Sequence, residues 1–354
     1  MKKKDFAFLK QLVETPSPSG YEQPAQRVIR AQLDGVADEI HTDVMGNLIA
    51  HLEGDGGPKL MLAGHCDEIG FMVQYVDDNG FIYFGAIGGV DPHLIPGQRV
   101  SIHAADTIIP GVIGKKAIHL IDPADREKVI KLKEQYIDIG CSNKEQVLKL
   151  VKIGDPITFS VGVEKLQGDR VASRAFDDKM GSFIVTEVMK RVKEQGGATA
   201  ELFSVSTVQE EVGLRGGTTS SYGVNPDAGI VVEVTHATDY PGVEKQGIGE
   251  VMVGEGPVIA RGANINPVLF DLLMQIAEAE KIPVQVIGVP RATGTDANAM
   301  QLSRGGVATA LVGIPLRYMH TPVEVLSLSD LENAIKLLTS FTLRLDKDQS
   351  FIPQ

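Results

Sequence analysis

From residue 164 onward, short apolar runs alternate with amphipathic segments. The runs ELFSVSTV (201–208), AGIVVEV (228–234) and ATALVGI (308–314) have the length and the β-branched content of buried strands. Between such runs, segments such as 328–345 carry apolar residues with helical spacing. Strands that alternate with helices predict a largely parallel sheet with helices on both faces. The sequence therefore predicts an α/β fold.

The N-terminal part of the chain extends this pattern. Apolar residues recur with helical spacing in residues 4–14 and 21–34, and residues 38–52 have the alternation and the Met-Gly-Asn turn of a β-hairpin. The run KLMLAG (59–64) predicts a buried strand that ends beside His65. We therefore expect a mixed sheet flanked by helices, built from both ends of the chain.

Residues 70–115 have a different character. Short β-type runs such as FMVQYV and RVSIHA alternate with Gly, Asp, Pro and Asn-Gly turns, which is typical of a small barrel or sandwich. Residues 155–163 again have a strand pattern. We therefore expect an α/β domain formed by residues 1–66 and 164–354, with residues 67–163 inserted into it as a β-rich, barrel-like domain.

Charge and composition limit the partners and the location. The 354 residues carry a formal net charge of −12, so nucleic acid is not an expected partner, because its binding needs basic surface. No apolar stretch has the length of a membrane span, and the basic start of the chain lacks the apolar core of a secretion signal. The two cysteines, Cys66 and Cys141, allow no disulfide framework. A cytoplasmic protein without membrane contact is the expectation.

Five residues of the metal-binding types stand just past the ends of predicted strands. Parallel strands bring their carboxyl ends to one edge of a sheet, where ligands bind, so these side chains are expected to converge. Any one of them alone would more often be a surface or capping residue, but their joint placement favours a metal site. The residues are His65, Asp177, Glu211, Glu233 and His320.

These residue types indicate the chemistry of the site. Imidazole and carboxylate ligands suit zinc, cobalt or manganese. Two metal ions about 3.5–4 Å apart need a bridging carboxylate, and a bound ion lowers the pKa of water towards ~7. A further carboxylate that does not ligate could then take the proton. The set therefore predicts two divalent metal ions and a general base.

Glu210 and Glu211 fit this division of roles, because neighbouring residues at a strand end point in different directions. One could face a metal ion and the other the water, although two adjacent acids are also common as surface charge. Asp67 follows His65 by two residues, so an extended backbone would place both on one face. Asp67 could then accept a hydrogen bond from His65 and fix its tautomer, or it could form a turn.

Six strings of the sequence resemble the tetrahedral (TET-type) metalloaminopeptidases, a family that includes glutamyl, leucyl and lysyl aminopeptidases. The resemblance covers nearly the whole chain in the same order, and VQEEVGLRG and RYMHTPVE are its most distinctive parts. The strings are GHCDEIGFMV (64–73), RAFDDKMG (174–181), VQEEVGLRGG (208–217), VVEVTHATD (231–239), GTDAN (294–298) and IPLRYMHTPVE (314–324).

The resemblance implies a role for each candidate residue. Asp177 would bridge the two ions, and its choice over Asp178 follows from the Asn that relatives often carry at the second position. The peptide bond between these two residues is expected to be cis. Many relatives have Asp in place of Glu233, which is a variation among ligating acids. The implied sets are His65, Asp177 and Glu233 for one ion, Asp177, Glu211 and His320 for the other, Glu210 as general base, and Asp67 as the residue that orients His65.

The resemblance also implies an activity and an assembly. The reaction would be the release of N-terminal residues from peptides, and the inserted β-rich domain would be a dimerisation domain. Dimers would assemble into a tetrahedral homododecamer. Arg291, just before the GTDAN loop, could select acidic N-terminal residues, or it could be a surface residue.

Two other activities remain open. A dinuclear-metal carboxypeptidase or deacylase would use the same ligand types. Some relatives carry the name endoglucanase, but a glycosidase needs two carboxylates across a cleft with stacking surface. The chain has no Trp, and its two candidate histidines fit metal ions better.

Overall fold

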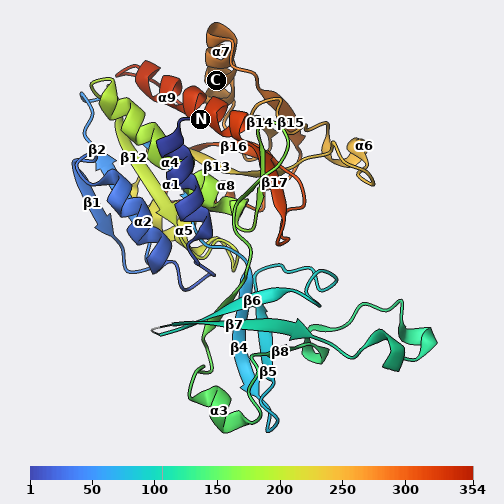
Figure 1. Ribbon diagram of the computed structural model, residues 1–354. Helices are drawn as coiled ribbons and strands as arrows, with labels where there is room; N and C mark the ends of the chain where they lie inside the picture. The colour runs from blue at the N-terminus through green and yellow to red at the C-terminus, as the bar shows by residue number, and fades with distance from the viewer. Residues whose placement is uncertain (106, 354) are drawn as a thin grey trace.

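The computed structural model describes residues 1–105 and 107–353. The chain forms a larger α/β part and a smaller barrel that lies below it in Figure 1. The larger part is built on an eight-stranded sheet. Along this sheet the strands are, in order, β1 (Glu39–Thr42), β2 (Leu48–Leu52), β12 (Glu201–Thr207), β3 (Lys59–His65), β13 (Ala228–His236), β16 (Ala308–Leu316), β14 (Val258–Gly262) and β15 (Gln285–Val289).

The central strands of this sheet are parallel. β12 pairs with β3, β3 with β13, and β13 with β16 in parallel register, so Thr207 lies opposite His65. β2 is antiparallel to β12, and β14 is antiparallel to β16. The sheet is therefore mixed, and the carboxyl ends of its four central strands lie along one edge.

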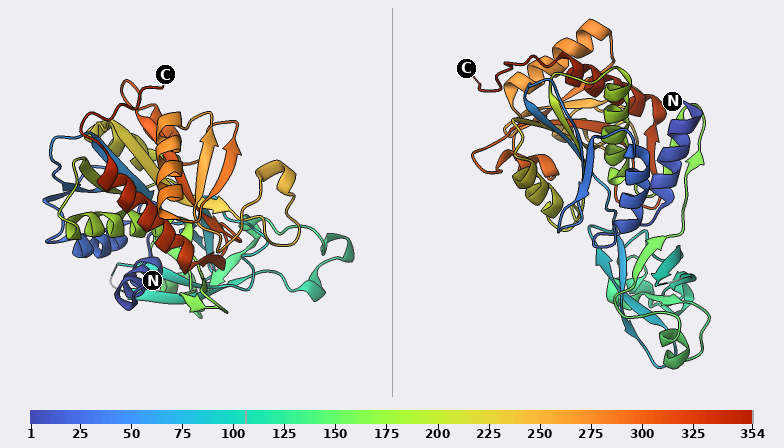
Figure 2. Two further views of the ribbon diagram at one scale, coloured as in Figure 1. Left: turned by 90° about the horizontal axis from the view of Figure 1, so that it is seen from above. Right: turned by 90° about the vertical axis from the view of Figure 1, so that its left-hand side faces the viewer.

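Helices cover both faces of the sheet (Figure 2, right). The helices of the larger part are α1 (Lys3–Glu14), α2 (Gln23–Leu33), α4 (Phe176–Glu194), α5 (Arg215–Val224), α6 (Lys245–Ile248), α7 (Pro267–Glu280), α8 (Asp296–Gln301) and α9 (Leu328–Arg344), of which α6 projects away from the sheet (Figure 1). On one face, α4 packs against β3, β13 and α9, and α1 and α2 pack against α4. On the other face, α5 and α8 pack against each other. In the described part of the chain, no helix is long and apolar enough to cross a membrane.

The smaller part is a closed barrel with the strand order β4-β5-β8-β7-β6-β9. It has its own apolar core, in which Phe71 packs edge-on against Phe84 and Phe159. The expected α/β fold with a mixed sheet and a barrel-like insertion is therefore confirmed. The barrel elements are β4 (Gly70–Val76), β5 (Ile82–Ile87), β6 (Arg99–Ala104), β7 (Thr107–Gly114), η1 (Ile118–Leu120), η2 (Pro123–Asp125), η3 (Leu132–Glu134), β8 (Tyr136–Asp138), α3 (Lys144–Leu148) and β9 (Pro156–Phe159).

Two segments connect the barrel to the α/β part, and a buried ion cluster joins them. The returning segment contributes β10 (Glu164–Lys165) and β11 (Arg170–Ser173) to a three-stranded sheet, whose third strand is β17 (Glu324–Ser327) from the C-terminal part of the chain. Glu68, on the outgoing segment, pairs with Arg174 after β11 and lies 2.7 Å from the ammonium of Lys179 in α4. All three side chains are buried. The cluster therefore holds both connections against the start of α4.

Two glycines bring the start of α4 close to the sheet. A Cβ atom on Gly64 would lie 2.4 Å from the backbone of Gly181, and one on Gly181 would lie 2.6 Å from the carbonyl oxygen of Val232. No larger residue fits such close backbone approaches. The start of α4 therefore lies directly against β3 and β13, with Asp177 near the end of β3.

Candidate active site

Three parallel strands bring acidic and imidazole side chains to the same edge of the sheet. His65 is the last residue of β3, Glu233 lies inside β13, and Glu210 and Glu211 follow β12 on a loop. His65, Glu210 and Glu233 are buried. The sequence had indicated a position just past the end of a strand for Glu233. In the structure Glu233 instead lies inside β13. The convergence expected from the parallel topology is present.

Glu210 and Glu211 diverge because of a turn and not because of strand alternation. Gln209 adopts a φ of 55°, and the carbonyl of Glu210 accepts hydrogen bonds from the amides of Gly213 and Leu214. As a result, the Glu210 carboxylate lies 3.7 Å from Nε2 of His65. The carboxylate of Glu211 instead lies 3.5 Å from Nε2 of His320.

Asp177 lies between the two histidines. One of its carboxylate oxygens is 3.3 Å from Nε2 of His65, and the other is 3.2 Å from Nε2 of His320. Asp177 stands at the start of α4, where its backbone is not helical and its peptide bond to Asp178 is cis. The cis bond that the resemblance implied is therefore present. The five expected ligand side chains come together around this carboxylate.

The distances between these atoms resemble those between ligands of a common ion. Nε2 of His65 lies 3.6 Å from an oxygen of Glu233, and these contacts of 3.2–3.6 Å lie at or beyond the upper end of hydrogen-bond distances. When a zinc ion has tetrahedral coordination and metal–ligand bonds of about 2.0–2.1 Å, its ligand atoms lie about 3.3–3.4 Å from one another. Two overlapping groups have ligand atoms within 4.8 Å of one another, His65 with Asp178 and Glu233, and His65 with Asp177 and Glu211.

The cluster concentrates negative charge in a buried place. Burial, together with repulsion from Glu233, raises the pKa of Glu210 to about 9. Burial and the neighbouring Asp177 raise the pKa of Glu211 to about 8, and burial also raises the pKa of Glu233. An oxygen of Glu211 is buried and has no hydrogen-bond partner in the described part of the protein. This donor set and its unbalanced charge fit divalent cations.

Asp67 connects His65 to the acidic loop. Nδ1 of His65 lies 3.0 Å from the main-chain carbonyl oxygen of Asp67 and 3.4 Å from its carboxylate. The same carboxylate accepts hydrogen bonds from the amides of Glu210 at 3.0 Å and Glu211 at 3.1 Å, and from the hydroxyl of Ser19 at 2.7 Å. Both the main chain and the side chain of Asp67 therefore hold the site together.

Sequence reasoning missed Glu324. This carboxylate is buried behind the site and accepts hydrogen bonds from the amides of Asp177 and His320, each at 3.1 Å. It therefore fixes the backbone of two site residues that are far apart in the chain. Its only signal in the sequence was its place at the end of the IPLRYMHTPVE string.

Sequence reasoning also missed Gly89, which belongs to the barrel. The carbonyl oxygen of Gly89 lies 2.8 Å from Nδ1 of His320. A Cβ atom on Gly89 would lie 3.0 Å from the same nitrogen, and one on Gly88 would lie 3.1 Å from the Glu211 carboxylate. The pair of glycines after β5 therefore lets the barrel backbone approach the site.

The cluster opens into a pocket of about 690 Å³. Besides the site residues, its walls include Thr235, His236, the 293–295 loop and apolar side chains from β15, β16 and α6. Arg291 is exposed and is not among the lining residues. A pocket of this size with few convergent polar groups is typical of a small-ligand site.

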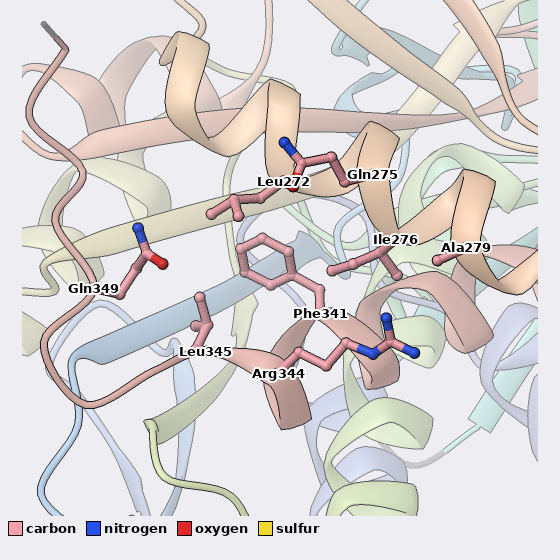
Figure 3. A pocket seen from close by; sticks show the side chains of 8 residues that line it. All are labelled: Leu272, Gln275, Ile276, Ala279, Phe341, Arg344, Leu345 and Gln349. Atoms are coloured by element: carbon pink, nitrogen blue, oxygen red, sulfur yellow. The ribbon is translucent and has the colours of Figure 1, made fainter.

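A second pocket of about 320 Å³ lies at the far end from the barrel, between α7, α9 and the C-terminal segment (Figures 1 and 3). Phe341 lies between Leu272 and Leu345 in its wall (Figure 3). Among the described residues that line it, Arg344 is the one ionisable side chain, and it pairs with Glu280 at 2.7 Å. This pocket lacks groups for catalysis, so the pocket at the carboxyl ends of the central strands is the candidate active site.

Comparison with known proteins identifies the family of this chain. Residues 46–337 match the family described as M42 glutamyl aminopeptidase. The lysyl aminopeptidase of Pyrococcus furiosus is 36% identical over 352 residues, which cover 99% of each chain. Among solved structures, the TET aminopeptidase from the marine sediment archaeon Thaumarchaeota archaeon SCGC AB-539-E09 has a TM-score of 0.93 and 33% identity, with 97% of both chains covered.

Another solved relative is the Pyrococcus horikoshii TET1 peptidase, with a TM-score of 0.86 and 31% identity over 96% of this chain and all of that one. The fold shared with these solved peptidases, together with the acidic, histidine-containing site, defines a peptidase. The chain belongs to the M42 family of peptidases. It is accordingly an aminopeptidase, an enzyme that hydrolyses peptide bonds.

Proposed function

We propose that this protein is a metal-dependent aminopeptidase that uses two divalent ions at the site around Asp177 to release N-terminal residues from peptides. The observation that carries the proposal is the placement of Asp177, whose two oxygens face Nε2 of His65 and Nε2 of His320 at 3.3 and 3.2 Å. A carboxylate shared in this way suits a bridging ligand in a site for two ions.

The ligand sets follow from the contacts of each histidine. Asp178 is set aside as a ligand, because its carboxylate accepts hydrogen bonds from the amides of His65 and Gly181, each at 3.1 Å. A carboxylate engaged in this way positions its neighbours. Zinc or cobalt, with manganese as a further possibility, suits the mixture of imidazole and carboxylate. One ion would be held by His65, Asp177 and Glu233, and the other by Asp177, Glu211 and His320.

Glu210 is the proposed general base. When bound, the divalent ions would lower the pKa of water and polarise the scissile carbonyl. The Glu210 carboxylate lines the pocket and lies 3.7 Å from Nε2 of His65, whereas the carboxylate of Glu211 lies 3.5 Å from Nε2 of His320. It would take a proton from water and pass it to the leaving amine, and its burial keeps bulk water from competing. Asp67, by holding the amides of Glu210 and Glu211, sets the direction of both side chains.

The assembly and location are part of the proposal. The Pyrococcus horikoshii TET1 peptidase can assemble into a tetrahedron or a large octahedral shell. We extend this behaviour to the present chain as a homo-oligomer in which the barrel mediates dimerisation and dimers form a tetrahedral dodecamer. The two cysteines are free, which agrees with a cytoplasmic location.

A substrate panel separates the proposed activity from its alternatives. After treatment with a chelator and reconstitution with Zn²⁺ or Co²⁺, the protein is expected to cleave amino-acid p-nitroanilides but not their N-acetylated forms. A deacylase would act on the acetylated compounds, and a carboxypeptidase would act on N-blocked dipeptides. An endoglucanase would release sugar from a soluble cellulose. Equal activity before and after chelation would contradict the metal requirement.

A further inference from the structure

The pocket lining combines two kinds of side chain. The proposed metal ligands and Glu210 are joined by a set of aliphatic and thioether side chains. Apart from those ligands and Glu210, His236 is the one ionisable side chain among the described residues that line the pocket. The apolar wall includes Ile248, Ile287, Val289, Leu311 and Met319.

Strand alternation explains the central part of this wall. β15 is the edge strand of the sheet, and successive side chains of a strand point to opposite faces. Ile287 and Val289 therefore face the pocket together, while Val286 between Gln285 and Ile287 is 44% exposed and is not a lining residue. A Cβ atom on Gly249 would lie 3.6 Å from Ile287, so the end of α6 packs beside the same wall.

The nearby cations are directed elsewhere. Arg317 donates to Asp239 at 2.8 Å, Arg261 lies over the ring of Phe270, and Arg291 is exposed outside the pocket. An acidic side chain in the apolar part of the pocket would therefore lose hydration without gaining a cation. Among the described lining residues, a basic side chain would find no carboxylate other than the proposed metal ligands and Glu210. Burying an unpaired charge is strongly unfavourable.

We propose that the pocket selects peptides whose N-terminal residue has an uncharged aliphatic side chain of leucine or methionine size, with Ile287 and Val289 as specificity-determining residues. This inference rests on the proposed aminopeptidase function. The apolar wall removes the water-exposed surface of such a side chain when the peptide binds. The same wall rejects glutamate and lysine because neither finds a partner there.

The wild-type protein tests the inference first. With Leu, Met, Glu and Lys p-nitroanilides after reconstitution with Co²⁺, kcat/KM is expected to be at least tenfold higher for Leu and Met than for Glu and Lys. A tenfold preference for Glu or Lys would overturn the selectivity and leave the aminopeptidase function standing. If none of the four were cleaved, the proposed function would fail and the inference with it.

Variants of the wall supply a second, independent measurement. Ile287→Lys is expected to lower kcat/KM for Leu at least tenfold and to raise the Glu-to-Leu ratio by a similar factor. Val286→Lys places the same charge one residue away on the opposite face and should leave the ratio within twofold. Arg291→Ala should also leave it unchanged. Equal effects of the two lysine variants would overturn the role of Ile287. If Ile287→Lys failed to fold, Val289→Thr would be measured in its place, and it is expected to have a reduced preference for Leu.

Discussion

Nδ1 of His320 lies 2.8 Å from the carbonyl oxygen of Gly89, so the barrel contacts the candidate active site directly. A carbonyl oxygen can only accept, and Nδ1 therefore carries the proton. With that proton on Nδ1, Nε2 would be the nitrogen available to a metal ion, and it lies 3.2 Å from the Asp177 carboxylate. The barrel thus does more than extend the molecule, because it sets the orientation of one proposed ligand.

Substituting Gly89 tests this contact. In Gly89→Ala, the new methyl group would lie 3.0 Å from Nδ1 and 3.3 Å from Cε1 of His320, so the ring must shift. Loss of a partner that orients a metal ligand costs about 10–100-fold in metal affinity or activity. We expect a decrease of this size in the affinity for Co²⁺ measured by titration calorimetry, with a matching decrease in kcat/KM.

The control for Gly89→Ala is a glycine with free space around it. Gly223 in α5 has no atom within 4 Å of the position of an added Cβ, so Gly223→Ala should leave affinity and activity unchanged. Unaltered metal affinity in Gly89→Ala would show that the barrel backbone does not orient His320.

Glu210→Gln tests the proposed general base. The amide cannot accept the proton from water, so kcat should decrease by roughly 10²–10⁴-fold. Because Glu210 is not among the proposed ligands, two ions per subunit should still be measured by elemental analysis. Glu194→Gln, at the exposed end of α4, is the matched control and should retain full activity. Loss of an ion from Glu210→Gln would instead make Glu210 a ligand.

The sequence predicted the parts of this molecule that depend on local pattern and on parallel topology. His65, Glu211 and Glu233 could be placed together because β3, β12 and β13 were recognisable as buried strands. Asp177 and His320 were also placed at strand ends, after the segments that form β11 and β16, but the bridging role of Asp177 was implied only by the resemblance.

Other parts depend on contacts that no local pattern records. α5 has the sequence RGGTTSSYGV, in which Gly, Thr and Ser disfavour a helix, and it forms because it packs against α8 and β12. Gly89 and Glu324 reach the site from the barrel and from β17. Their roles arise only when distant segments meet, so the sequence alone could not assign them.

Metal binding should stabilise the fold, and Asp177 should carry most of that effect. A ligand that binds only the folded state at 100 times its Kd stabilises by about 2.7 kcal/mol. Adding Co²⁺ to chelator-treated protein should therefore raise Tm by several degrees. Asp177→Asn weakens both proposed ion sites and should remove more than half of the increase, whereas Asp55→Asn at an exposed position should not. A full increase in Asp177→Asn would argue against a shared ligand.

The buried ion cluster at the barrel connections gives a prediction for stability. Although burial opposes it, Arg174 and Lys179 lower the pKa of Glu68 from 4.5 to about 2. A lowered folded-state pKa stabilises the protein above pH 4.5, and this contribution is lost as the pH falls towards 2.

Glu68→Gln leaves two buried cations without their anion and should cost about 3–5 kcal/mol at pH 7. In urea unfolding, the difference from wild type should shrink between pH 4.5 and 2, while Glu164→Gln on exposed β10 should stay within about 0.5 kcal/mol at every pH. A constant deficit across this range would mean that packing, and not the charge of Glu68, sets its contribution.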